Sequence, residues 1–480
     1  MTTTAVGQVD GTKPDDHSKA HLGLTLLALC AAGLVVSLQQ TVVIPLLPRF
    51  IVQLNTDVAG VTWLFTAALL SGAVATPLLS RFGDMYGKKP MVMVTMGVLI
   101  VGSVVCAFAT TLPVYIIGRA LQGISSAMIP LAIGIIRDTF PRERLVGAIG
   151  IVSGTMGVGG TVGLLATGII ANHTTNPHPV FWLTAGLGVI ATVLIQVSAK
   201  NNGVRHGGKP DYIGAALLAA LLVCLLLGIS EGPRWGWGSG STIALFVAAA
   251  ALAAVWVFVE LKVEQPLVRL QLLVGPQSLS ANIASALLGF SMFGAFSLVS
   301  NFIQSPADKL GYGLSGSVLD VGLYGIPSAA LMTFFSFNTG RISARIGPAY
   351  TLAIGAVFAG LSMGWLAFSH GHGYDMIIAN VLQGTGFGIG YAALGTLAVQ
   401  HVPMSESGIA SGINSLVRTA GGSIAGAITG SILTAHVLHL APHVTPPTEG
   451  AYVASFATLA IGAFGAAAVA LGHGIRHKGN

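Results

Sequence analysis

Long apolar runs alternate with short polar segments along most of the chain. A helix needs about 20 mostly apolar residues to cross a bilayer. Fourteen runs meet this length, and they begin near residues 22, 60, 90, 113, 144, 180, 211, 241, 277, 315, 348, 374, 406 and 450. Each should be an α-helix, because a segment surrounded by lipid must satisfy its own backbone hydrogen bonds. The pattern predicts an all-α integral membrane protein with fourteen transmembrane helices.

The polar segments between the runs indicate the orientation. With the N-terminus in the cytoplasm, Arg49, Arg234 and Lys309 fall outside the cell, and Arg119 and Arg418 lie within spans. The other seventeen of the 22 Lys and Arg residues then face the cytoplasm. Cytoplasmic loops carry such an excess of positive charge. The sequence therefore predicts a multi-pass protein of the cell (plasma) membrane with both termini in the cytoplasm.

Two pairs of segments show a weak internal repeat. "YIIGRALQGI" (115–124) aligns with "MIIANVLQGT" (376–385), and "SRFGDMYG" (80–87) aligns with "GRISARIG" (340–347). Both offsets correspond to eight helices, so a six-helix unit is duplicated with two helices inserted between the copies. Parallel halves of this kind place a substrate site between them near the bilayer midplane. The predicted organisation is a tail (1–20), a six-helix bundle (21–200), two inserted helices (201–270) and a second six-helix bundle (271–475).

Composition supports a membrane protein and limits its partners. Hydrophobic residues make up 53% of the chain and charged residues 8%, against about a quarter charged in soluble proteins. The net charge of +6 follows from the orientation of the spans and needs no nucleic-acid partner. The three cysteines lie inside apolar runs and indicate neither a disulfide set nor a metal site. We expect no cofactor, no metal and a monomer.

One charged segment, "LLSRFGDMYGKKP" (78–90), interrupts the apolar pattern after the second run. Gly87 permits a tight turn, and Lys88 and Lys89 are expected to stay in the cytoplasm. Asp84 could face the N-terminus of a helix, where the helix dipole favours an anion. A simpler interpretation is that this basic loop serves only to orient the protein in the membrane.

Several segments resemble the major facilitator superfamily. "SRFGDMYGKK" (80–89) resembles its loop signature, Gly-x-x-x-Asp-Arg-x-Gly followed by basic residues, with Ser80 and Met85 as departures. "GRALQG" (118–123) is similar to its Arg-x-x-Gln-Gly signature, and "GTMGVGGTVGLLATG" (154–168) to its antiporter signature. The segments "PDYIGAALLA", "EGPRWGW", "EQPLV" and "NSLVRTAGG" resemble the fourteen-helix drug:proton antiporters. The resemblance implies no enzyme, but a transporter that exports drug-like or secondary-metabolite small molecules, coupled to protons, by alternating access.

Two other functions stay open at this point. The fourteen-helix group often carries Leu-Asp-x-Thr in its first helix, whereas this chain has Gln39 at the position of the acid. A glutamine cannot carry a proton, so the coupling group and the direction of transport are open. The alternatives are a proton-coupled importer or exchanger of an ordinary metabolite, and a membrane sensor that transports nothing.

Charged residues inside spans are candidates for proton coupling, because charge in the membrane is costly and usually functional. Asp320 is expected about five residues into the tenth span, and Arg119 and Arg418 could modulate its proton affinity. The alternatives are that Asp320 caps the start of its helix and that both arginines only hold helices together.

Polar side chains in the spans could line the substrate cavity. We expect this cavity to suit a large, weakly polar ligand, and its candidate residues are Gln39, Gln40, Gln122, Tyr324, Gln383 and Asn414.

The resemblance and the helix dipole together predict a conformational latch at residues 78–90, which includes Asp84, Gly87, Lys88 and Lys89. Asp84 should dock against the N-terminus of the thirteenth span, around Ser405 to Gly408, when the cytoplasmic side is closed.

Overall fold

The computed structural model describes residues 16–56, 58–174, 176–198, 211–264, 266, 268, 270, 275–400, 402–403, 407–438 and 446–476. These residues form helices and no β-strand. Fourteen helical segments are long and apolar enough to cross a membrane, and each begins within three residues of its predicted start. The predicted all-α fold with fourteen spans is confirmed. Most of the predicted tail, up to residue 15, lies outside the described residues.

The N-terminal half contains the first six spans. Its fourth span is assembled from α5, η2 and α6, so that a short 3-10 turn interrupts the α-helix near its middle. The elements of this half are α1 (Asp16–Thr41), η1 (Ile44–Leu46), α2 (Leu47–Gln53), α3 (Val58–Tyr86), α4 (Lys88–Phe108), α5 (Leu112–Ile124), η2 (Ser125–Ala127), α6 (Met128–Thr139), α7 (Arg142–His173) and α8 (His178–Ser198).

The C-terminal half contains the last six spans, preceded by the two inserted helices. The inserted helices are α9 (Tyr212–Trp235) and α10 (Gly240–Lys262). The C-terminal half consists of α12 (Pro276–Gln304), α13 (Ala307–Leu310), α14 (Val318–Ile346), α15 (Pro348–Phe368), α16 (Gly373–Gln400), α17 (Ser407–Ala435) and α18 (Glu449–Arg476).

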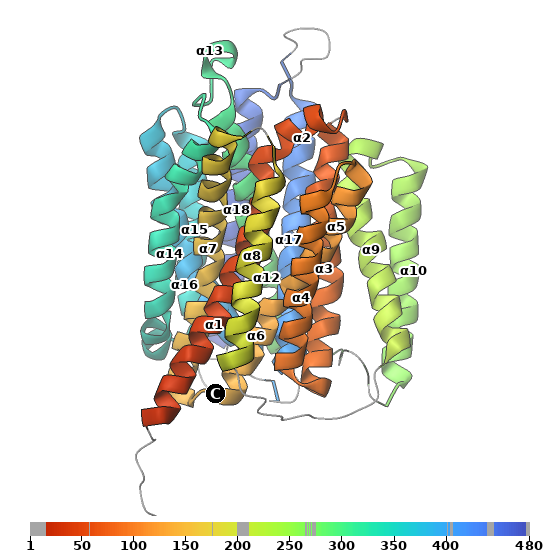
Figure 1. Cartoon of the computed structure of the whole chain (residues 1–480), viewed down its shortest axis with the longest axis vertical. Coiled ribbons are helices and arrows are strands. Elements are labelled where there is room, and N and C mark those ends of the chain that lie inside the picture. The colour runs from red at the N-terminus through yellow and green to blue at the C-terminus, as the bar shows by residue number, and fades with distance from the viewer. Residues whose placement is uncertain are drawn as a thin grey trace, which may run out of the picture.

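The spans end on two opposite sides of the molecule (Figure 1). Helix α1 begins and α18 ends on the same face, at the bottom of the figure, which we call the terminal face. The short helices α2 and α13 lie on the other side, which we call the opposite face.

The two halves meet chiefly through α7, which packs on α14 and α16, and through α17, which packs on α3 and α6. Glycines allow α7 and α14 to approach closely. A Cβ atom on Gly150 would lie 2.4 Å from the carbonyl oxygen of Ser336, and one on Gly168 would lie 2.7 Å from the Cα of Leu319. Small residues of this kind let helix backbones pack closely in a membrane, where no hydrophobic effect drives them together.

The inserted helices lie at one edge of the molecule, to the right in Figure 1, with α10 outermost. Helix α9 packs against both α3 and α17. Its residues Leu222 and Leu226 are buried in one apolar cluster with Ala73 of α3 and Ile413 of α17. One inserted helix therefore covers a seam between the two halves, while the other has most of its surface facing outward.

Candidate functional site

A charged cluster ties the two halves together at the terminal face. We call it the terminal-face lock, and it consists of Asp84, Lys88, Arg137 and Asp138 with the backbone of Val402, Gly408 and Ile409. The carboxylate of Asp84, in the last turn of α3, accepts hydrogen bonds from the backbone N–H groups of Gly408 (3.2 Å) and Ile409 (3.0 Å) at the start of α17. The predicted contact of Asp84 with this helix N-terminus is present.

The charges of the terminal-face lock balance within the lock. The Lys88 ammonium lies 3.4 Å from Asp84 Oδ1 and 2.6 Å from Asp138 Oδ2. Arg137 donates a hydrogen bond from Nη2 to the carbonyl oxygen of Val402, which is a second contact between the halves. Two acids thus face two bases, and Asp84 is only 1% exposed. Ionised groups that are buried need such partners, because removing one leaves an uncompensated charge.

Glycines permit the close approach at the lock. Gly87 has φ = 109°, a conformation that glycine adopts easily, and it separates α3 from α4 by a single residue. A Cβ on Gly408 would lie 2.6 Å from Asp84 Oδ1, and a Cβ on Gly412 would lie 2.7 Å from Ser80 Oγ. The serine that replaces the first glycine of the loop signature therefore fits against a glycine of α17.

The structure corrects the expected location of one lysine. Lys88 was expected in the charged segment before the third span, but it is the first residue of α4 and its side chain is buried between two carboxylates. Asp138, the nearest partner of Lys88, was not predicted from the sequence. It lies at the end of the fourth span, and the sequence does not indicate which helix that end contacts. Lys89 donates a hydrogen bond to the carbonyl oxygen of Gln196 at the surface. Of the predicted docking segment, residues 405 and 406 lie outside the described residues.

Arg119 lies in a buried polar cluster of the N-terminal half. Its guanidinium donates to the carbonyl oxygen of Leu64 (2.8 Å), to the carbonyl and side-chain oxygens of Gln39 (2.9 and 3.0 Å), and to Gln122 Oε1 (2.7 Å). The amide of Gln122 donates in turn to Ser103 Oγ. In the described part of the chain, all the acceptors of Arg119 are neutral oxygens. Gln39 thus makes a neutral contact with Arg119 at the position where the resemblance would place an acid.

Arg418 occupies a second cluster, within the C-terminal half. It donates from Nη2 to Ser415 Oγ (2.8 Å), and its guanidinium lies 4.4 Å from the ring centroid of Tyr391 on α16. Cations are attracted to the face of an aromatic ring in this arrangement. Each arginine is thus bonded within its own half.

Asp320 lies nearer to the end of its span than expected. Helix α14 begins at Val318, three residues later than predicted, so Asp320 is its third residue. Its Oδ2 accepts from the backbone N–H and the hydroxyl of Ser317, both at 2.7 Å, and the hydroxyl accepts from the N–H of Asp320. This reciprocal arrangement is a capping box, which satisfies the free N–H groups of a helix start. The alternative of a cap residue is correct, and a role as proton carrier deep in the span is not retained.

The six residues expected to line a substrate cavity are distributed over several places. Gln39 and Gln122 are fully buried around Arg119, and Gln40 lies 3.5 Å from Ser126 Oγ in the same half. Asn414 is buried and accepts a hydrogen bond from Ser285.

The other two lie on the C-terminal half. Gln383 is buried on α16, and the hydroxyl of Tyr324 lies against Gly373 at the start of α16, on the opposite face. A shared cavity for the six stays a prediction.

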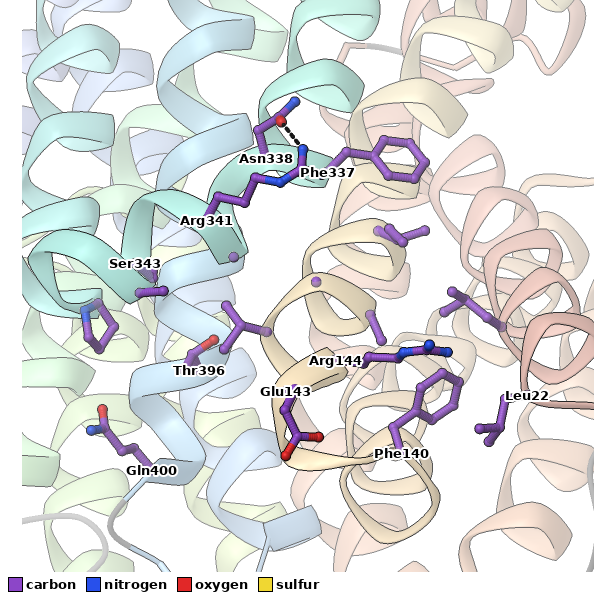
Figure 2. Close-up of a pocket in the computed structure, with 18 of the residues that line it drawn as sticks. Leu22, Phe140, Glu143, Arg144, Phe337, Asn338, Arg341, Ser343, Thr396 and Gln400 are labelled. Carbon is purple, nitrogen blue, oxygen red and sulfur yellow. Dashed lines mark hydrogen bonds between the residues drawn. The ribbon is translucent and has the colours of Figure 1, made fainter. Parts of the chain in front are cut away.

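A large cavity lies at the terminal face, where α1 and α7 begin and α14 and α16 end (Figure 2). Its volume is about 910 Å³. In Figure 2, Arg341 and Asn338 of α14 lie on one side of α7 and Leu22 of α1 on the other, with Arg144 between them. None of the site residues predicted from the sequence lines this cavity. It is built from the ends of four separate helices, so no local pattern in the sequence marks it.

The comparisons with known proteins fit this architecture. A family model described as Major Facilitator Superfamily matches residues 29–426. The chain belongs to the major facilitator superfamily. Its fourteen spans are those expected of the fourteen-helix drug:proton antiporter group within that superfamily.

Two curated relatives from this superfamily are exporters or resistance proteins by name. The chain is 26% identical over 420 residues to the "Tetracenomycin C resistance and export protein" of Streptomyces glaucescens, covering 86% of this chain and 76% of the relative. It is 25% identical over 426 residues to the "Multidrug resistance protein Stp" of Mycobacterium tuberculosis, covering 87% and 78%.

A solved structure has the same fold. The human organic anion transporter MFSD10 (TETRAN) superposes with a TM-score of 0.62 at 13% identity, covering 96% of this chain and all of the other. At that identity the likeness concerns the fold alone. Together the comparisons identify a membrane transporter of small molecules.

Proposed function

We propose that this transporter exports drug-like or secondary-metabolite small molecules from the cytoplasm by alternating access. The terminal face would be the cytoplasmic one, because most of the described Lys and Arg residues near the ends of the spans lie there. The names of the relatives support export, since one concerns tetracenomycin C resistance and export and another multidrug resistance.

The observation that carries the mechanism is the contact between Asp84 and the start of α17. It joins the two halves at one face through two hydrogen bonds that a small rotation of the halves would break. Alternating access requires contacts of this kind, because each face must close in one state and open in the other. The terminal-face lock would hold the cytoplasmic side closed.

The proton coupling implied by the resemblance stays a prediction. Its expected carrier, Asp320, is engaged in a capping box at the start of α14. The acceptors of Arg119 are neutral, and position 39 carries no acid. Export and its driving force are therefore separate questions.

A growth-inhibition panel tests the proposal. A pump-deficient bacterial host would express the full chain, its Asp84→Asn variant or no transporter, and would be exposed to a broad set of antibiotics and dyes. Export predicts that the full chain raises the inhibitory concentration of some compounds and that Asp84→Asn abolishes this protection. Unchanged sensitivity to every compound, or greater sensitivity with the full chain, would contradict export.

A further inference from the structure

The cavity at the terminal face has walls from both halves and lies level with the ends of the spans. Leu22 is the first residue of the first span and Arg144 the second residue of the fifth, whereas Arg341 lies five positions before the end of the tenth. Spans end where the hydrocarbon core of the bilayer meets the lipid head groups. The substrates of transporters with parallel halves bind near the midplane instead. The position of this cavity therefore favours a lipid over a transported compound.

The walls of the cavity are formed by one face of each of three helices. Residues three or four positions apart lie on the same face of a helix. The cavity is lined by such pairs, which are Leu22 and Leu26 on α1, Gly147 and Ile151 on α7, and Phe337 and Arg341 on α14. A Cβ on Gly23 or on Gly147 would meet no atom within 4 Å, so the space beside α1 and α7 is open. The three faces thus enclose a chamber of about 910 Å³ that has apolar side chains on each helix.

Two guanidinium groups line the cavity, one from each half. Arg144 and Arg341 are exposed, and neither forms an ion pair with a carboxylate in the described part of the chain. Arg341 donates a hydrogen bond only to a neutral oxygen, Oδ1 of Asn338 (3.0 Å). The one acid among the lining residues is Glu143, and its side chain points away from that of Arg144 in Figure 2. Two positive charges and one negative charge leave the cavity with a net charge of +1.

A buried hydroxyl in the same wall has no hydrogen-bond partner. Ser343 lies on α14 and is 7% exposed, and its Oγ bonds no atom of the described residues. A buried polar group without a partner is costly, so an acceptor oxygen of a ligand in the cavity would be stabilising. Helix α7 also begins beside the cavity without a side-chain cap, and a helix start favours an anion. Both features supply donors for an oxyanion.

We infer that the cavity binds a phospholipid of the adjoining leaflet through an anionic head group. Basic pockets between spans recognise such head groups, and here the guanidinium groups of Arg144 and Arg341 supply the attraction. An acyl chain would follow Phe337, whose ring is 52% exposed, to the outer surface of α14. Because the walls come from both halves, the bound lipid would link α1 and α7 to α14 and α16 and favour the closed terminal face.

Native mass spectrometry of the purified full chain in detergent would count the lipids that the protein retains. The probe is an equimolar mixture of phosphatidylglycerol, which is anionic, and phosphatidylcholine, which is zwitterionic, with identical oleoyl chains. We expect phosphatidylglycerol to be retained at least about tenfold more than phosphatidylcholine, because two arginines attract its head group. An excess of glycerol 3-phosphate should not displace it, since this soluble anion has no apolar part to occupy the chamber.

Variants separate the charge of the cavity from its shape. Arg144→Gln and Arg341→Gln should each lower the preference for phosphatidylglycerol by about fivefold, and Arg341→Lys should retain part of it. Gly147→Leu keeps every charge but fills the open space, so it should lower the retention of phosphatidylglycerol as well. The matched control is Arg476→Gln, which removes an exposed guanidinium at the end of α18, outside the cavity, and should leave the preference unchanged.

Four results would overturn the inference. Equal retention of the two lipids, or a preference that survives both glutamine variants, would show that the cavity does not select an anionic head group. A preference that survives Gly147→Leu would place the lipid outside the cavity. Release by glycerol 3-phosphate would indicate a site for soluble anions. The export proposal is tested separately, because lipid retention does not depend on the compound that is transported.

Discussion

At the scale of single residues, Asp84 connects the sequence motif to a mechanical role. Its carboxylate is buried, it accepts two backbone N–H groups from the other half, and it lies beside Lys88. Hydrogen bonds to charged groups contribute about 1.5–3 kcal/mol each. Two such bonds are enough to shift the balance between a closed and an open terminal face by orders of magnitude.

The variant Asp84→Asn should therefore cut export by about tenfold or more while leaving expression and thermal stability largely intact, because the lock exists in only one of the two states. The amide has no charge to oppose that of Lys88, which would keep only Asp138 as a counter-ion. The effect would be measured as the rate of efflux of a compound against which the full chain protects the host in the growth panel. The matched control is Lys89→Gln, which removes a charge at the neighbouring surface position and should leave efflux near the wild-type rate. Wild-type efflux in Asp84→Asn would show that the contact is not a latch.

These residues show what the sequence can indicate about a site. The position of Asp84 was predictable, because an acid at the end of a span and a helix N-terminus attract each other wherever the halves close. The burial of Lys88 was not, since it depends on how α6 places Asp138 beside it. Asp320 was misplaced although the sequence "SVLD" (317–320) has the Ser-x-x-Asp spacing of a capping box. The apolar residues around it concealed the start of the helix.

At the scale of helices, α14 starts with the capping box of Ser317 and Asp320. We expect Asp320→Asn to lower stability by about 1 kcal/mol, since an asparagine oxygen can still accept from the backbone N–H of Ser317 but the negative charge at the helix N-terminus is lost. Efflux should remain close to that of the wild type, because the carboxylate of Asp320 is engaged in capping the helix at the opposite face. Thermal unfolding and efflux of the same variant would be measured together. Loss of uphill transport with unchanged stability would restore Asp320 as a coupling residue.

The packing of α7 on α14 depends on glycines at particular positions. A Cβ on Gly150 would lie 2.4 Å from the backbone oxygen of Ser336, whereas a Cβ on Gly147, one turn earlier, would meet no atom within 4 Å. Gly150→Ala should force the two helices apart and lower the melting temperature, and Gly147→Ala should be neutral. Destabilisation in overpacked sites is about 1–3 kcal/mol. Equal melting temperatures for the two variants would contradict the close packing of the halves along these helices.

Helix positions were predictable along the whole chain, whereas the contacts between helices were not. The apolar runs locate every span to within three residues, because each span must satisfy its backbone and exclude charge by itself. The cavity at the terminal face is different, since Leu22, Arg144 and Arg341 come together only through the packing of distant helices. The spacing of apolar residues along the chain does not indicate which distant helices pack together.

At the scale of the whole molecule, we propose that the two six-helix halves rock about a substrate site between them. The halves make contact through α7 with α14 and α3 with α17, and a lock at the terminal face opposes opening there. Opening the terminal face should therefore close the opposite face. This reciprocity is the central claim, and it can be measured without knowing the substrate.

The measurement uses pulsed electron resonance between pairs of spin labels in nanodiscs. One pair, at Val197 of α8 and Ile475 of α18, reports on the terminal face, and both side chains are exposed. The other pair, at Phe108 of α4 and Phe368 of α15, reports on the opposite face, where both are also exposed. The native cysteines Cys30, Cys106 and Cys224 would first be replaced by alanine.

The two distances should change in opposite directions when the lock is removed. In the Asp84→Asn background, the account predicts a longer distance across the terminal face and a shorter one across the opposite face, relative to the protein with an intact lock. Lys89→Gln should leave both distributions unchanged. Distances that stay the same in Asp84→Asn, or that lengthen on both faces together, would contradict alternating access controlled by this contact.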